Sequence, residues 1–328
     1  MTTRTGYALV VTTHGGPDVL AVQEHDVPEP GAGEVLVEVA AAGVNFIDVY
    51  QREGVYPTVP PFVIGQEGAG VVSAVGADAA GFAVGDRVAW PFAGGSAASL
   101  VRVLSRDLVR VPDAVDLETA AAVMLQGLTA HYLTRSTYAV GAGTTALVHA
   151  AAGGVGQLLV QMVKALGGIV VATAGTDEKC STAAELGADH TINYRTEADL
   201  SAAVRAATGG GGVDVAYDGV GKDTFEASLA SLRPRGLLAL YGAASGQVPP
   251  FDLQRLNGAG SLFVTRPSLP HHLATAAELA WRADEVLAAV ADGTLRVAIG
   301  GRYALTDAAA AYAGLEGRRS QGKLLLIP

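Results

Sequence analysis

The sequence has a single cysteine, Cys180, among its 328 residues. One thiol excludes an internal disulfide framework and any zinc site built from several cysteines. Charged residues are also scarce, at 16%, while hydrophobic residues reach 50%, so disorder is not expected. No uncharged run reaches the roughly 18 apolar residues of a membrane helix. The N-terminal segment MTTRTGYALVV lacks the apolar stretch of a signal peptide, so we expect a soluble, cytoplasmic protein.

Acidic residues outnumber basic ones by 32 to 22, which gives a net charge of −10. This excess disfavours binding to nucleic acid or to an anionic membrane, because both carry charge of the same sign. The length of 328 residues is enough for about two domains of roughly 150 residues each. These properties agree with a two-domain enzyme that acts on a small molecule.

The most informative segment runs from Thr145 to Leu166. Its first part, TALVHA, is short and apolar, which predicts a buried parallel strand. Its last part, QLLVQMVKAL, has apolar residues at the spacing of one helix face. Between them, Ala150, Gly153 and Gly156 form the pattern A-x-x-G-x-x-G, which also occurs in plain turns. The flanking strand and helix favour a dinucleotide site, in which the helix N-terminus meets a pyrophosphate.

The pattern of the chain changes near residue 145. Before it, short runs such as EVLVEVAAAG, interrupted by Gly, Pro and Asp, predict an antiparallel barrel or sandwich over residues 1–125. After it, strands and helices alternate, which predicts a doubly wound parallel sheet and an α/β fold. The strand–helix–strand pattern of the tail indicates that residues 266–328 complete the first domain. Residues 126–265 then form the second domain.

Three expected helices and one strand can be checked individually. The Ala-rich segment predicts a helix over Leu117–Met124 and a second one over Gln126–Ser136. A long helix is expected from His271 to Gly293. The apolar strand Ser261–Thr265 is expected at an edge of the sheet, where it would be open to pairing with a second subunit.

Nine segments resemble one family across nearly the whole chain: HGGPDVL, AAGVNFIDVYQREGVYP, GFAVGDRVAW, GLTAHYL, HAAAGGVGQ, GTDEK, INYR, VTRPSL and SQGKLLLIP. Together they are similar to the zinc-free quinone oxidoreductases, the zeta-crystallin-like branch of the medium-chain dehydrogenase/reductase superfamily. The resemblance implies a GroES-like catalytic domain, a Rossmann NADPH domain, a cleft between them and a homodimer.

The expected absence of metal rests on residue types. Zinc enzymes of this superfamily carry a Gly-His-Glu segment, and the corresponding segment here resembles Gly65-Gln66-Glu67. No cysteine precedes Cys180, and the seven histidines, expected in surface or packing positions, show no helical i, i+4 pair. Reduction of a ketone creates an alkoxide with a conjugate-acid pKa of roughly 16, which a metal helps to stabilise. Reduction of a quinone creates a phenolate-like oxygen with a pKa of about 10, so quinones and activated alkenes are the expected substrates.

The expected cofactor is NADPH. The predicted strand Ile169–Thr173 has no carboxylate at its tip, where an NAD site would carry one. By resemblance, Lys179, Tyr194 and Arg318 surround the 2′-phosphate, which suits cationic partners. The resemblance also implies cofactor contacts for further residues: Asn45, Thr129, Ala152, Gly153, Gly154, Val155, Gly156, Thr176, Tyr241, Gly242, Phe263 and Val264.

The resemblance places Asn45, Tyr50 and Tyr56 near the nicotinamide and the substrate. Their amide and hydroxyl groups would orient the ring or hydrogen-bond a quinone oxygen. The residues alone favour a turn position for Asn45 and half-buried packing positions for the tyrosines. The expected activity is zinc-independent hydride transfer from NADPH to a quinone. The alternatives are an NADPH-dependent reductase of enones or enoyl thioesters, and a non-enzymatic NADPH-binding protein.

Overall fold

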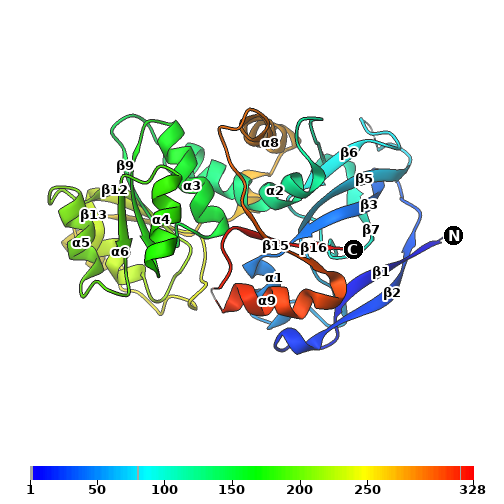
Figure 1. Cartoon of the computed structure of the whole chain (residues 1–328), viewed down its shortest axis with the longest axis horizontal. Helices are drawn as coiled ribbons and strands as arrows, with labels where there is room; N and C mark the ends of the chain where they lie inside the picture. Colours follow the sequence, from blue (N-terminus) through cyan, green and yellow to red (C-terminus); the bar gives the residue numbers. More distant parts are fainter. Residues whose placement is uncertain (1–2, 80, 318) are drawn as a thin grey trace. The chain divides into compact units, whose positions relative to one another are not determined.

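The computed structural model describes residues 3–79, 81–317 and 319–328. Contacts divide the chain into two compact units. The first unit comprises Met1–Leu128 and Leu273–Pro328, and the second comprises Thr129–His272. Figure 1 shows both units coloured along the sequence. Within the described ranges, no helix is long and apolar enough to cross a membrane.

The first unit is built on two sheets that are mainly antiparallel, as its alternating sequence predicts. The larger sheet has the order β15-β16-β3-β5-β6-β8, with β7 paired to β3. Its strands are β3 (Glu34–Gly43), β5 (Glu67–Val75), β6 (Arg87–Trp90), β7 (Leu100–Leu104), β8 (Val109–Arg110), β15 (Ile299–Ala304) and β16 (Lys323–Ile327). The smaller sheet, β2-β1-β4, comprises β1 (Thr3–Val11), β2 (Leu20–Pro28) and β4 (Phe62–Val63).

The tail of the chain completes this first sheet. β16 pairs antiparallel with β3 and parallel with β15, so the last strand lies inside the sheet begun by the first domain. The core of the unit includes Leu9, Val37 and Trp90 from early strands and Leu324 and Leu326 from β16. Burying these side chains together stabilises the pairing of segments nearly 300 residues apart, counted from Val37 to Leu324.

Among the described residues of the first unit, the α-helices that belong wholly or mainly to it are α1 (Phe46–Arg52), α2 (Leu117–Tyr132), α8 (Ala276–Ala291) and α9 (Ala308–Glu316). The expected break between Met124 and Gln126 was wrong, because α2 is one continuous helix. A Cβ on Gly127 would lie only 2.9 Å from the Val286 side chain, so this glycine marks close packing on α8. The expected helix from His271 was too long, since Thr275 caps α8 by accepting the N–H of Glu278.

The second unit is a six-stranded parallel sheet with the order β11-β10-β9-β12-β13-β14. Numbered within the unit, this is the order 3-2-1-4-5-6 of a doubly wound dinucleotide-binding fold, and it confirms the prediction. The strands are β9 (Thr145–Val148), β10 (Ile169–Ala174), β11 (His190–Asn193), β12 (Val213–Asp218), β13 (Leu232–Leu240) and β14 (Phe263–Thr265). The strand order reverses between β9 and β12, where ligands bind in such sheets.

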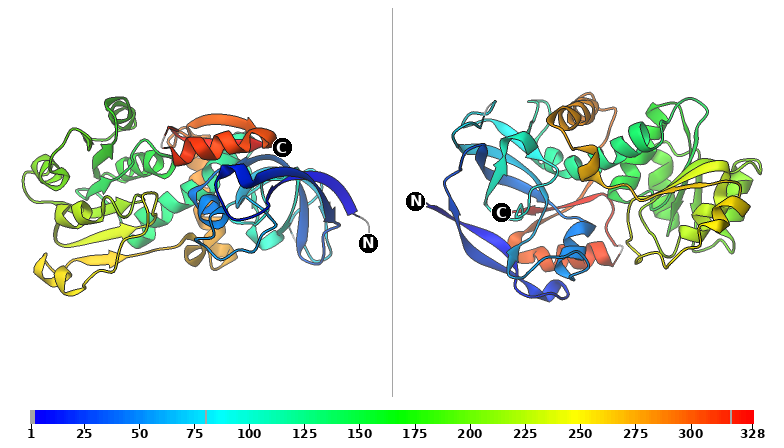
Figure 2. Two further views of the ribbon diagram at one scale, coloured as in Figure 1. Left: turned by 90° about the horizontal axis from the view of Figure 1, so that it is seen from below. Right: turned by 180° about the vertical axis from the view of Figure 1, so that it is seen from behind.

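The helices of the second unit alternate with its strands, as Figure 2 shows from two further directions. They are α3 (Gly154–Ala165), α4 (Asp177–Glu185), α5 (Leu200–Ala207), α6 (Phe225–Ser231) and α7 (Gln254–Gly258). Leu147, Val171, Ala216 and Leu238, one from each of the four central strands, belong to the buried core of the unit. Strands buried in this way have apolar sequences, which is why they could be predicted.

Candidate functional site

The dinucleotide loop follows β9 directly. Ala150 has a positive φ of 49°, Gly153 is the N-cap of α3, and α3 begins at Gly154. A Cβ on Gly156 would overlap the carbonyl oxygen of Ala150, so only glycine allows the helix to approach the strand this closely. The N–H groups of the first helical turn have no partner within the helix. The loop therefore presents a helix N-terminus at the reversal of strand order, which suits a pyrophosphate.

A buried polar network lies directly behind this loop. The His149 ring is fully buried, with Nδ1 2.8 Å from Thr173 Oγ1 and Nε2 2.9 Å from Ser228 Oγ. Ser228 and Thr224 each donate to Asp218 Oδ2 at 2.7 Å. Because the Ser228 proton goes to Asp218, His149 donates from Nε2 and accepts at Nδ1. Burial lowers the pKa of His149, which favours this neutral form.

This network ties β9, β10, β12 and α6 together where the loop begins. From the sequence, His149 was expected in a surface or packing position, and Ser228 and Asp218 were not singled out. No spacing in the sequence marks the three as partners, since they lie in different elements.

Thr176, Lys179 and Tyr194 gather at the ends of β10 and β11. Thr176 caps α4 by accepting the N–H of Lys179 at 3.2 Å. A Cβ on Gly175 would lie 2.5 Å from the Tyr194 hydroxyl and 3.6 Å from Arg195 Nε. Partial burial, followed by the nearby Arg195 guanidinium, lowers the pKa of Lys179. Two cations and a phenol therefore lie together beyond β10, which suits an anion such as a phosphate.

Arg195 was not among the residues expected from the sequence, although it directly follows Tyr194 in the segment INYR. Arg318, the third expected partner of the 2′-phosphate, lies outside the described residues.

The remaining expected cofactor residues are spread over three elements. Tyr241 and Gly242 follow the end of β13, and the Tyr241 ring lies close to Gly219, the residue after β12. Thr129 is buried in α2. Phe263 and Val264 form most of β14, the strand at one end of the sheet, and are 60% and 37% exposed. Tyr241 and Gly242 thus lie at the same strand-end edge as the dinucleotide loop.

In the first unit, Asn45 lies between β3 and α1 and is only 5% exposed. Its Nδ2 donates to the Gly43 carbonyl at 3.2 Å and to Glu67 Oε1 at 2.7 Å. Its Oδ1 accepts from Lys323 Nζ at 2.7 Å, and Lys323 also forms an ion pair with Glu67. Glu67 Oε2 accepts the N–H of Leu125 at 2.6 Å. We call Asn45, Glu67 and Lys323 the Asn45 network.

Tyr50 and Tyr56 form an aromatic group with Phe46 on and after α1. The rings of Tyr50 and Tyr56 are 5.4 Å apart and inclined by 59°, and those of Phe46 and Tyr50 are 6.2 Å apart. The backbone N–H of Tyr56 donates to the Tyr50 carbonyl at 3.0 Å, which holds the turn after the helix. Both tyrosines are partly exposed, so they offer aromatic surface to a ligand.

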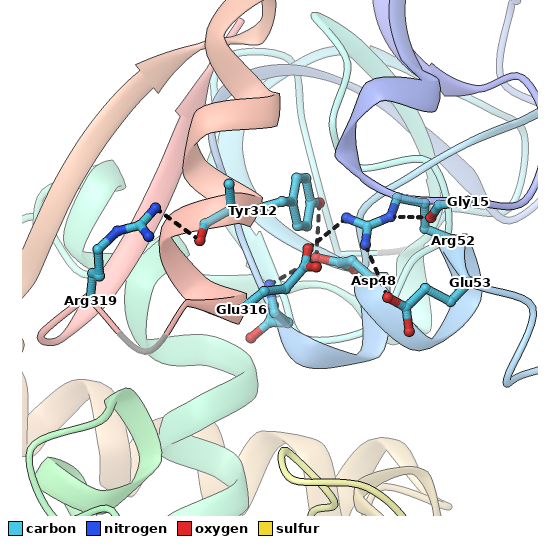
Figure 3. Close-up of polar contacts among 9 residues, drawn as sticks. Gly15, Asp48, Arg52, Glu53, Tyr312, Glu316 and Arg319 are labelled. Atoms are coloured by element: carbon cyan, nitrogen blue, oxygen red, sulfur yellow. Dashed lines mark hydrogen bonds and ion pairs between the residues drawn. The ribbon is translucent and has the colours of Figure 1, made fainter. Parts of the chain in front are cut away.

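Asp48 and Arg52 connect α1 to α9, as Figure 3 shows. Asp48 Oδ2 accepts the Asn45 N–H at 2.8 Å and the Tyr312 hydroxyl at 3.2 Å. Asp48 Oδ1 is buried without a hydrogen-bond partner among the described residues. Burial raises the pKa of Asp48 to about 7. Arg52 is fully buried and forms an ion pair with Glu316 at 2.8 Å.

The segment expected to replace a zinc site does not offer zinc ligands. Gln66 Nε2 donates to Gln51 Oε1 at 3.0 Å, and the Glu67 carboxylate is taken by Lys323, Asn45 and Leu125. In the part of the chain that the structure describes, no group of three or more His, Cys, Asp or Glu residues could hold a metal ion. An amide and an ammonium group do not fit the nitrogen, sulfur and carboxylate donors that zinc needs.

The ion pair of Glu67 and Lys323 was missed by the sequence analysis. One signal was present: Lys323 begins the apolar strand segment KLLLIP, and a lysine in a buried strand requires a partner of opposite charge. The identity of that partner could not be found from spacing, because Glu67 lies 256 residues away.

Comparisons with known proteins cover both units. Residues 31–113 match the alcohol dehydrogenase GroES-like domain, and residues 154–281 match the zinc-binding dehydrogenase domain. The chain is 45% identical to a quinone oxidoreductase of Pseudomonas aeruginosa, covering 96% of this chain and 97% of the relative. It is 42% identical to a 2-haloacrylate reductase of Burkholderia sp, covering 98% of each. The crystal structure of Escherichia coli quinone oxidoreductase complexed with NADPH superimposes with a TM-score of 0.96 at 42% identity, covering 99% of this chain and 100% of that one.

Proposed function

This chain belongs to the quinone oxidoreductase family of the medium-chain dehydrogenase/reductase superfamily, and we propose from that premise that it transfers hydride from NADPH to a quinone. The observation that carries the proposal is the similarity to quinone oxidoreductases along nearly the whole chain, together with an intact dinucleotide loop. The two proposed domains are residues 1–125 completed by 266–328, and residues 126–265. A cytoplasmic location is part of the same proposal.

NADPH is the cofactor, and it supplies the hydride when bound. The segment Ala152–Gly156 offers the pyrophosphate the first-turn N–H groups of α3. Thr176, Lys179 and Tyr194 are proposed for the 2′-phosphate, because they lie together beyond β10 in a region with two cations. Arg318 joins them through the family resemblance alone. Thr129, Tyr241, Gly242, Phe263 and Val264 complete the proposed cofactor contacts.

Tyr50 and Tyr56 are proposed to receive the quinone. Their rings offer flat apolar surface, and their hydroxyl groups offer donors to the oxygen on which negative charge develops. Asn45 contributes differently, because both of its amide protons are already donated inside the protein. We propose that Asn45 shapes this part of the site and orients the reacting groups, while the tyrosines donate hydrogen bonds.

The proposed reaction is independent of zinc. Support comes from Gln66, whose amide bonds Gln51, and from Lys323, whose ammonium group already neutralises Glu67. A quinone needs less help than a ketone, because its reduced oxygen is a phenolate with a pKa of about 10. Exhaustive chelation, with metal content checked by elemental analysis, should leave quinone reduction intact. Loss of turnover on removal of stoichiometric zinc would overturn this part of the proposal.

Reduction of activated alkenes is the second candidate. It is favoured by the 42% identity to a 2-haloacrylate reductase over nearly the whole of both chains. A conjugated carbonyl also spreads the incoming charge, so the same site without metal suits both substrate types. Steady-state oxidation of NADPH with a panel of 1,4-quinones beside enones and 2-haloacrylates separates them by kcat/KM. The main proposal expects the highest kcat/KM for a quinone, and a clear preference for an alkene would replace it.

We also propose a homodimer that pairs through β14. This strand ends the sheet, and its Phe263 side chain is 60% exposed. An apolar edge strand with free backbone groups is open to antiparallel pairing with its copy across a two-fold axis. Light scattering at micromolar concentration should give twice the mass of the chain, and Val264→Pro should shift the protein toward the monomer. A monomeric wild-type protein would refute the dimer.

A further inference from the structure

We propose that Lys323 is a positioning residue, which holds the Asn45 side-chain amide in one orientation through the buried ion pair with Glu67. The inference rests on the proposed function, because it concerns a residue assigned there to the reaction site. It goes further by naming the residue that fixes the orientation of the Asn45 side-chain amide.

The orientation follows from the donors and acceptors of the Asn45 network. A lysine ammonium group can only donate hydrogen bonds, and an ionised carboxylate can only accept them. Lys323 Nζ lies 2.7 Å from Asn45 Oδ1, while Glu67 Oε1 lies 2.7 Å from Asn45 Nδ2. Rotating the amide by half a turn would place its NH₂ group against the ammonium and its oxygen against the carboxylate. The two charges therefore select one of two orientations that have nearly the same shape.

The ion pair is buried and well supplied with partners. Lys323 and Glu67 are 1% and 0% exposed, so neither charge is solvated by bulk water. The second oxygen of Glu67 is satisfied by the Leu125 N–H at 2.6 Å. Gly43 leaves the space for the pair, because a Cβ there would overlap Glu67 Oε1 and lie 2.6 Å from Lys323 Cε. Removing one member of such a pair leaves an uncompensated buried charge.

The fixed orientation limits what Asn45 can offer a ligand. Both Nδ2 protons are used, by the Gly43 carbonyl and by Glu67. The carbonyl oxygen Oδ1 accepts from Lys323, and the Asn45 side chain also accepts from the backbone N–H of Asp48 in the capping box of α1. The donors and the acceptor of the amide are therefore engaged inside the protein, and Asn45 acts on a ligand by fixing the shape of this part of the site. Without Lys323 the amide oxygen loses its charged donor, and only Glu67 and the Gly43 carbonyl still hold the amide in this orientation.

The first test compares the replacement of Lys323 with the replacement of Arg52, both in the first unit. Lys323→Met removes the charge and keeps the length, and Arg52→Met breaks the partly buried ion pair with Glu316 near α1 without touching the Asn45 network. We expect kcat/KM for quinone reduction, per folded molecule, to fall roughly tenfold or more in Lys323→Met, as for a lost hydrogen bond in a reaction site. Arg52→Met should stay within about twofold of the wild type. Equal losses in both variants would mean general loosening of α1 and would overturn the proposal.

The second test does not depend on catalysis. The chain has three asparagines, Asn45, Asn193 and Asn257, so labelling asparagine alone with ¹⁵N gives three side-chain amide signals. The Asn45 signals, assigned by Asn45→Ser, should shift and broaden in Lys323→Met, because the amide oxygen loses its hydrogen bond from the ammonium group and the amide is held less tightly. Those of Asn193 and Asn257 should not change, and neither should those of Asn45 in Arg52→Met. Unchanged Asn45 signals in Lys323→Met would overturn the proposal even if the variant were inactive.

A double variant covers the case in which Lys323→Met fails to fold. Lys323→Met with Glu67→Gln removes both charges, and the buried neutral pair should fold. Because glutamine can either donate or accept, the Asn45 amide should still lose its single orientation and kcat/KM should still fall. Wild-type rates and wild-type Asn45 signals in the double variant would overturn the proposal. Failure of the wild-type protein to reduce any quinone would instead defeat the proposed function, while the amide signals would still decide whether Lys323 orients Asn45.

Discussion

Asp48 gives a prediction about stability that can be worked from its surroundings. Its carboxyl group is fully buried, and one oxygen has no hydrogen-bond partner among the described residues. Burial raises its pKa from the ordinary 3.8 to about 7, against the lowering effect of the hydrogen bonds from Asn45 and Tyr312. The folded protein therefore binds the Asp48 proton more tightly than the unfolded chain does. The stability that this contributes is complete below the ordinary pKa and is lost as the pH rises through about 7.

The magnitude follows from the size of this pH window. Over part of the pH range the folded protein keeps the Asp48 proton while the unfolded chain has lost it. There, the unfolding free energy changes by about 1.4 kcal/mol for each pH unit. As the pH rises from about 5 to about 8, ionisation of Asp48 should therefore lower the unfolding free energy of the wild-type protein by roughly 2–3 kcal/mol. Asp48→Asn resembles the protonated acid and does not titrate. The unfolding free energy of the variant minus that of the wild type should rise by the same amount over this range.

Urea unfolding of both proteins at matched pH measures this difference. Comparison at each pH cancels the effect of other groups such as His149, whose lowered pKa makes its contribution decline as the pH falls. Tyr312→Phe should move the transition to higher pH, because it removes a hydrogen bond that lowers the pKa of Asp48. A constant difference between wild type and Asp48→Asn across the range would refute the reasoning.

Three further predictions concern the second unit. Lys179→Ala should weaken NADPH binding by roughly tenfold or more and leave NADH binding nearly unchanged, since a charge-assisted contact is worth about 1.5–3 kcal/mol. Equal losses in titrations with both cofactors would contradict its role at the 2′-phosphate. Gly156→Ala should abolish NADPH binding measured by fluorescence, because the alanine Cβ would overlap the Ala150 carbonyl oxygen. Wild-type affinity for NADPH in this variant would contradict the close packing of the loop. Ser228→Ala should lower the unfolding free energy by about 1–3 kcal/mol, because the buried His149 Nε2 loses its hydrogen-bond partner. An unchanged midpoint of urea unfolding would count against the hydrogen-bond network around His149.

Several features of this protein were determined by local sequence. The strands β9, β10 and β12 are short apolar runs, and a strand buried on both faces needs such residues wherever it occurs. The loop from Ala150 to Gly156 could be predicted because its requirement is also local: small residues between a strand and a helix. The alternation of strands and helices then left a doubly wound sheet as the arrangement that buries all of them.

Helix boundaries depended on partners that lie far away in the sequence. The expected break between Met124 and Gln126 was wrong, because α2 continues through Leu125 to Tyr132. In the structure, Gly127 lies inside α2 because Val286 of α8 packs against it. The cost of glycine in a helix is about 1 kcal/mol, which close packing can offset. Only the position of α8 shows which effect prevails.

The chemistry of the candidate site was decided by tertiary structure. Asn45, Tyr50 and Lys179 could be named from motifs, but the sequence does not show that Lys323 and Glu67 take the amide of Asn45. Periodicity records which face of an element is buried, because that depends on neighbours three or four residues away. A hydrogen bond or ion pair depends on where two side chains meet in space, and Glu67 and Lys323 are 256 residues apart. Their meeting places a donor beside the oxygen of the Asn45 amide and an acceptor beside its nitrogen.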